Sequence, residues 1–141
     1  PVVCANVDLS ATPLAPYVQP CAIVKKAGRT IGIIGAAPNL FSVVISSVRG
    51  NIKMCEDDAS VINSYAEKLA KKCDLVVLLS HMGYKEDQEL AARLHHVDLI
   101  VGGHSHTTVS DIIEVPDADG KLVRIITDGM WGLTIGEITI R

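Results

Sequence analysis

Residues 74–106 read DLVVLLSHMGYKEDQELAARLHHVDLIVGGHSH, two short apolar runs separated by a polar segment. The first run, residues 75–79, is unbroken and too short for a helix, which is typical of a strand buried on both faces. Residues 85–95 repeat apolar side chains at helical spacing. The second run, residues 97–101, ends in two glycines. Strand, helix and strand in this order predict a parallel unit in which the two strands are adjacent.

A second helix and a hairpin are predicted before the first run. Residues 58–72 have apolar side chains at helical spacing, and Asp57 or Asp58 is a suitable N-cap. Residues 21–26 and 30–35 flank a turn at Gly28, which indicates an antiparallel hairpin. These segments extend the α/β pattern toward the N-terminus.

The remaining segments are shorter and more polar. The sequence predicts a short strand over residues 2–7 and irregular structure over residues 38–50. After the glycines, residues 112–115, 123–127 and 133–140 predict antiparallel strands. The fold class is therefore α/β, with parallel β-α-β units and an antiparallel C-terminal portion.

Composition excludes several functional classes. The chain has 141 residues, 48% of them hydrophobic, which is enough to bury one core and too apolar for a disordered chain. The net charge of -3 offers no basic field, so we expect no nucleic-acid partner. The longest apolar run is far below the ~20 residues of a membrane-spanning helix. We therefore expect a single domain with no membrane span.

The four cysteines are Cys4, Cys21, Cys55 and Cys73. Their spacing fits neither a zinc ribbon nor a redox pair, so we interpret them as small apolar residues of the interior. One or two disulfides in an oxidising compartment remain the alternative. A catalytic thiol is disfavoured, because none of them has a histidine nearby in the sequence.

Histidines follow both apolar runs. His81 comes two residues after the first, and His104 and His106 come after the second and its Gly102-Gly103 pair. Parallel strands end at one edge of a sheet, where open α/β sheets bind ligands, and residues i and i+2 of an extended chain point the same way. Imidazole suits Zn, Fe, Mn, Co or Ni. The sequence therefore predicts a metal site formed by these three histidines.

Other polar residues have simpler interpretations. His95 and His96 end the predicted helix, where exposure to solvent is expected. Asp74 and Asp98 each precede an apolar run and are interpreted as loop-end residues. Asp128 follows a predicted strand and is a weaker candidate for the edge of the site.

A resemblance to a known family is carried by residues 79–84, by Asp87, Leu90 and Ala91, and by residues 97–107, and it is supported by residues 5–7, 29–35 and 131–136. They resemble the calcineurin-like metallophosphoesterases, and among these the 5'-nucleotidase and UDP-sugar hydrolase group. The resemblance implies part of a metallophosphoesterase β-sandwich flanked by helices. It also implies two divalent metal ions, Zn, Mn or similar, which support attack of water on a phosphate ester. Residue by residue, it implies that His81 and His104 bind one ion and that His106 binds the other.

Several motifs of that family do not occur in this chain. The missing motifs are Asp-x-His, Gly-Asp-x-x-Asp and Gly-Asn-His-Asp/Glu, and we expect them upstream of Pro1. They would supply the bridging carboxylate and the histidine that assists the leaving group. No catalytic residue is therefore assigned within residues 1–141, which we expect to form a single, partial metallophosphoesterase domain. The N-terminal half of that domain and a C-terminal substrate-binding domain are expected in the rest of the protein.

The leading hypothesis is a fragment of a metal-dependent, 5'-nucleotidase-like phosphohydrolase that converts a nucleoside phosphate to nucleoside and phosphate. The resemblance implies a periplasmic, cell-surface or secreted protein. Two alternatives stay open. One is a non-catalytic α/β fragment or subunit, and the other is a mononuclear three-histidine zinc hydrolase that is active by itself.

Overall fold

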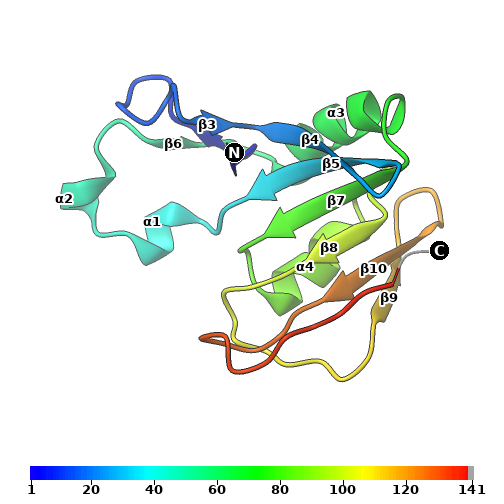
Figure 1. Cartoon of the computed structure of the whole chain (residues 1–141). Coiled ribbons are helices and arrows are strands. Elements are labelled where there is room, and N and C mark those ends of the chain that lie inside the picture. Colours follow the sequence, from blue (N-terminus) through cyan, green and yellow to red (C-terminus); the bar gives the residue numbers. More distant parts are fainter. Residues whose placement is uncertain (140–141) are drawn as a thin grey trace.

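A six-stranded sheet forms the centre of the computed structural model, which describes residues 1–139 (Figure 1). In spatial order its strands are β4 (Cys21–Lys26), β5 (Arg29–Ala36), β7 (Leu75–Ser80), β8 (Leu99–Val101), β10 (Leu122–Ile126) and β9 (Ile113–Pro116). The four inner strands are parallel, and each edge strand is antiparallel to its neighbour. The inner strands therefore end at one edge of the sheet, as their arrowheads in Figure 1 show.

The helices and two small strand pairs complete the described part of the chain. The helices are α1 (Leu40–Val43), α2 (Ser46–Arg49), α3 (Asp58–Ala70) and α4 (Tyr84–Ala91). The small pairs are β1 (Val2–Val3) with β3 (Val18–Gln19), and β2 (Val7–Asp8) with β6 (Lys53–Met54). Within residues 1–139, no helix has the length and apolar character needed to cross a membrane.

The predicted parallel unit is confirmed. β7 and β8 are adjacent and parallel, with Val77 opposite Leu99, and α4 connects them. The predicted hairpin is also confirmed, since β4 and β5 pair antiparallel around a turn whose Gly28 has a φ of 76°. Glycine suits this position because a positive φ is strained for other residues.

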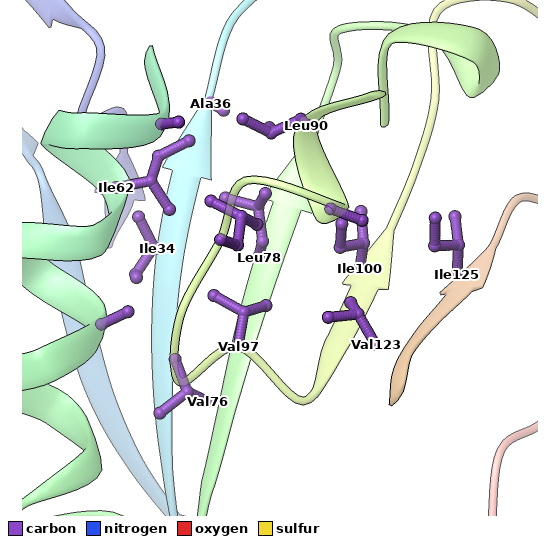
Figure 2. Packing of buried hydrophobic residues seen from close by; sticks show 14 of the residues in the cluster. Ile34, Ala36, Ile62, Val76, Leu78, Leu90, Val97, Ile100, Val123 and Ile125 are labelled. Carbon is purple, nitrogen blue, oxygen red and sulfur yellow. The ribbon is translucent and has the colours of Figure 1, made fainter. Parts of the chain in front are cut away.

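The core lies between one face of the sheet and the helices α3 and α4 (Figure 2). Alternate residues of each inner strand point to this face, because side chains of a strand alternate between its two sides. The strands contribute, among others, Ile34, Leu78, Ile100 and Ile125, and the helices contribute Ile62, Ala66, Leu69 and Leu90. On the opposite face Leu79 is 42% exposed. The helix-covered face is therefore the main source of buried apolar area.

The prediction of a strand over residues 133–140 is wrong for the described part of that range. Residues 133–139 form no strand, and Ile140 lies outside the described residues. The neighbouring strand β10 is already paired on both sides, with β8 and with β9, so it offers no free edge to this segment. The tail instead lies along the sheet, where Ile138 shares a pocket with Leu99 and Arg124.

Three boundaries also differ from the prediction. The expected strand over residues 2–7 is split into β1 and β2, which pair with different partners. The expected irregular segment 38–50 contains α1 and α2, each one turn long. The helix expected to reach His95 ends at Ala91, because the N–H groups of Arg93 and Leu94 bond three residues back in tighter turns.

A candidate metal site at the carboxyl edge of the sheet

His81 begins the loop after β7, at the edge where the parallel strands end. Its backbone N–H donates to the carbonyl of Ala36 at the end of β5, 2.9 Å away. Its ring lies against the next loop, since a Cβ on Gly103 would come within 2.9 Å of His81 Nδ1. Glycine at position 103 therefore allows this close approach, which any side chain would block.

His104 lies beside His81, as the spacing of the two loops predicts. The centroids of the two rings are 5.1 Å apart, with an interplanar angle of 63°, and both side chains are exposed. Two imidazoles that share one tetrahedral Zn at about 2.0–2.1 Å have ring centroids on the order of 5 Å apart. The arrangement of His81 and His104 thus fits two ligands of one ion.

His106 has a different neighbour. Its ring centroid lies 6.0 Å from that of Trp131, in an edge-to-face arrangement, and Trp131 is 81% exposed. Among residues 1–139, no three His, Cys, Asp or Glu side chains form a ready group for a metal ion. The structure thus brings together two of the three predicted histidines, and the role of His106 remains a prediction.

The backbone of this loop is strained. His104 and His106 have φ values of 72° and 56°, in the left-handed region that non-glycine residues rarely adopt. Each such residue costs of order 1–3 kcal/mol and persists only where the surroundings fix it.

The loop after β10 contacts the two residues that follow His106. The hydroxyl of Thr127 and the N–H of Gly129 both donate to the carbonyl of Thr107, at 3.1 and 3.0 Å. Asp128, the weaker candidate for the site, forms a β-bridge with Thr108. The segment 127–129 therefore holds the loop that carries His106, and Asp128 takes part through its backbone.

A buried carboxyl group lies behind the two paired histidines. Asp87 of α4 is fully buried and accepts a hydrogen bond from the hydroxyl of Ser80, the last residue of β7. Its Oδ2 has no hydrogen-bond partner within the described residues. Burial raises the pKa of Asp87 from 3.8 to about 6. No role was predicted for Asp87 from the sequence, although a carboxylate three residues before the core residue Leu90 on a helix was a usable signal.

The shifted pKa of Asp87 leads to a prediction on stability. A carboxyl whose folded pKa is raised stabilises the fold at low pH, and this stability is lost as the pH rises through the folded pKa of about 6. Relative to Asp87→Asn, the wild-type chain is expected to lose up to about 3 kcal/mol between pH 4 and pH 8. Urea unfolding of both proteins across this range, with a chelator present, measures the difference. Parallel pH profiles would contradict the assignment of a buried, titrating carboxyl.

The other polar residues lie away from the paired histidines or accept hydrogen bonds from backbone N–H groups of the sheet. Asp74 accepts from the N–H of Thr30 at 2.7 Å, and Asp98 accepts from the N–H of Val76 at 2.8 Å, so both are loop-end residues as predicted. The partner of His95 is Asp119, whose carboxylate lies 2.7 Å from its Nδ1 and raises the pKa of the imidazole.

All four cysteines are free thiols, and each is partly buried. Burial raises the pKa of every one of them, and that of Cys55, which donates to Asp58, reaches about 12. Because a nucleophilic cysteine needs a lowered pKa, these thiols are not suited to catalysis, in agreement with their interpretation as structural residues.

Comparison with known proteins finds relatives over almost the whole chain. The sequence is 31% identical to an apyrase of Tabanus yao over 159 aligned residues, which cover 99% of this chain and 28% of the apyrase. It is 32% identical to a probable 5'-nucleotidase of Treponema pallidum (strain Nichols), over 99% of this chain and 26% of that protein. The chain therefore spans little more than a quarter of the length of these relatives. No family model matches the sequence.

Solved structures show the same fold. A 5'-nucleotidase precursor from Thermus thermophilus superposes with a TM-score of 0.84 at 34% identity, over 93% of this chain and 28% of that chain. A calcineurin-like phosphoesterase from Bacillus subtilis superposes with a TM-score of 0.70 at 20% identity, over 94% of this chain and 47% of that chain. The second likeness concerns the fold alone.

Proposed function

We propose that this chain, which is 32% identical to a probable 5'-nucleotidase and shares its fold with a 5'-nucleotidase precursor at 34% identity, is part of a metal-dependent phosphohydrolase that acts on nucleoside phosphates. The observation that carries the proposal is the pair of exposed imidazoles, His81 and His104, whose ring centroids lie 5.1 Å apart where two neighbouring parallel strands end. The products would be a nucleoside and inorganic phosphate.

In this proposal the histidines divide between two ions. His81 and His104 would hold one divalent ion, Zn²⁺ or Mn²⁺, and His106 would hold the second. Such ions, when bound, activate a water for attack and offset charge on the phosphoryl oxygens. Gly103, directly before His104, leaves room for the ring of His81, and the loop after β10 donates a hydrogen bond to the carbonyl of Thr107, next to His106.

The remaining ligands and the group that assists the leaving group are proposed to lie in the rest of the protein. This chain spans little more than a quarter of the length of these relatives, and residues 1–141 would then form one partial domain. We also propose that the whole protein works outside the cytoplasm, in the periplasm, at the cell surface or as a secreted enzyme. The word "precursor" in the name of the Thermus relative is compatible with this.

The chain by itself is expected to bind at most one Zn²⁺ or Mn²⁺ tightly and to hydrolyse AMP no faster than background. Three histidines without a bridging carboxylate supply too few ligands for two ions. Titration with a metal indicator and a phosphate-release assay measure both properties, with His81→Ala as the variant that lacks a ligand. Turnover of AMP that a chelator abolishes would instead favour the mononuclear three-histidine hydrolase.

The whole protein provides the test of the proposed function. We expect it to release phosphate from a 5'-nucleotide, to lose this activity on dialysis against a chelator, and to regain it when Zn²⁺ or Mn²⁺ is added back. A whole protein that binds the metal through His81 and His104 but hydrolyses no nucleotide, cyclic nucleotide or nucleotide-sugar would support the non-catalytic alternative.

A further inference from the structure

The carboxyl group of Asp87 is buried, but only one of its two oxygens has a hydrogen-bond partner among the described residues. Its side chain is fully buried, one oxygen accepts from Ser80, and Oδ2 has no partner within the described residues. A buried carboxylate with an unpaired oxygen is unfavourable, and an apolar side chain would fill the same space without this cost. The position of Asp87 therefore calls for a reason other than stability.

On one side Asp87 contacts the loop that begins with His81. The hydroxyl of Ser80 donates to the carboxylate of Asp87, and the oxygen of the same hydroxyl accepts from the N–H of Met82 at 3.1 Å. The two residues that flank His81 are thus both tied to one hydroxyl group, and the carboxylate sets the direction of that hydroxyl. This arrangement fixes the backbone on either side of the imidazole.

On the other side Asp87 lies directly against the loop that carries His104. A Cβ on Gly102 would lie 2.5 Å from Asp87 Oδ2, so the backbone of this loop rests on the carboxylate. The N–H of Gly102 donates to the carbonyl of Ile126 at 2.8 Å, which ties the same point to the end of β10. One side chain thus touches both loops that bring the paired imidazoles together.

We propose that Asp87 is a positioning residue that sets the separation of His81 and His104 through its contacts with Ser80 and Gly102. This inference rests on the proposed function in one respect, namely that the paired imidazoles bind an ion. Groups that orient metal ligands in this way typically change metal affinity by 10–100-fold when they are removed. Asp87 does not itself bind the ion in this proposal.

The test compares Asp87 with a second buried carboxylate at another place in the fold. Asp117 is also buried, and its Oδ2 also has no partner in the described part of the chain. It lies in the turn between β9 and β10, where its Oδ1 accepts from the N–H groups of Asp119 and Lys121. In the whole protein, Asp87→Ala is expected to weaken Zn²⁺ binding by about 10–100-fold in competition with a chelator. Asp117→Ala is expected to lower the thermal unfolding temperature with unchanged Zn²⁺ affinity. The near-isosteric Asp87→Asn, which keeps an acceptor for Ser80, is expected to restore most of the affinity.

A double-mutant cycle tests the contact with Gly102. Gly102→Ala places a methyl group against Asp87 and is expected to weaken Zn²⁺ binding in the wild-type background, but much less in the Asp87→Ala background, where the space is free. Equal losses of affinity from Asp87→Ala and Asp117→Ala, or an effect of Gly102→Ala that is independent of Asp87, would overturn the proposal. A whole protein that does not bind Zn²⁺ would overturn it together with the proposed function. A protein that binds Zn²⁺ with the expected dependence on Asp87 but hydrolyses no ester would overturn the proposed function alone.

Discussion

Replacing His104 by alanine in the whole protein is expected to lower phosphohydrolase activity by more than about 100-fold. Loss of a group that merely orients a metal ligand costs 10–100-fold, and removal of the ligand itself is expected to cost more. His104 is one of the two imidazoles whose geometry fits a shared ion, and no other histidine is paired with His81 in the described part of the chain. The measurement is the rate of phosphate release from a nucleotide at saturating Zn²⁺ or Mn²⁺.

His96→Ala is the matched control for this substitution. Like His104, His96 is exposed and has a left-handed backbone, with a φ of 61° against 72°. The two alanine variants therefore place the same residue type in the same strained conformation, and they differ in the loss of the proposed ligand. We expect His96→Ala to keep nearly full activity. Equal losses from the two variants would count against the assignment of His104.

A large loss of stability is expected from Leu78→Ala. Leu78 is fully buried at the centre of the core, on the face of β7 that α3 and α4 cover (Figure 2). Truncation of a buried leucine removes packed apolar surface and leaves a cavity, which typically destabilises a protein by 2–5 kcal/mol. A loss in that range would unfold a substantial fraction of a marginally stable chain. Urea unfolding monitored by circular dichroism measures this free energy.

The adjacent residue Leu79 gives the control. It belongs to the same strand but points to the opposite face, where it is 42% exposed. We expect Leu79→Ala to cost less than about 1 kcal/mol, because little packed surface is lost. If Leu79→Ala were as destabilising as Leu78→Ala, the opposite face would contribute as much as the helix-covered one, and the assignment of the core would be wrong.

The parallel centre of the fold was predictable because its signals are local. The apolar runs at residues 75–79 and 97–101, with helical spacing between them, predict adjacent parallel strands, and the structure confirms this. The segment 133–139 has a comparable alternation of residues but forms no strand, and β10, the strand before it in the sequence, is already paired on both sides. Strand pairing depends on which edges other segments occupy, and no pattern within a segment contains that information.

In the candidate site, too, some features could be predicted from local sequence signals and others depend on tertiary packing. The position of His81 and His104 after neighbouring parallel strands was enough to predict that their rings would lie together. The contact between His106 and Trp131 was not predictable, because it depends on how the loop after β10 lies on the loop after β8. The burial of Asp87 beneath Gly102 depends likewise on the packing of α4 against the ends of two strands.

The left-handed backbone of His104 and His106 places function and folding in opposition. Glycine adopts this conformation without penalty, so a population of variants selected only for thermal robustness should accumulate glycine at both positions. A histidine at either position therefore lowers the stability of the fold, and only selection for its function would keep it there. Directed evolution of this protein would therefore need to screen for metal binding in every round, since selection for heat resistance alone would replace the two histidines that are proposed to bind the ions.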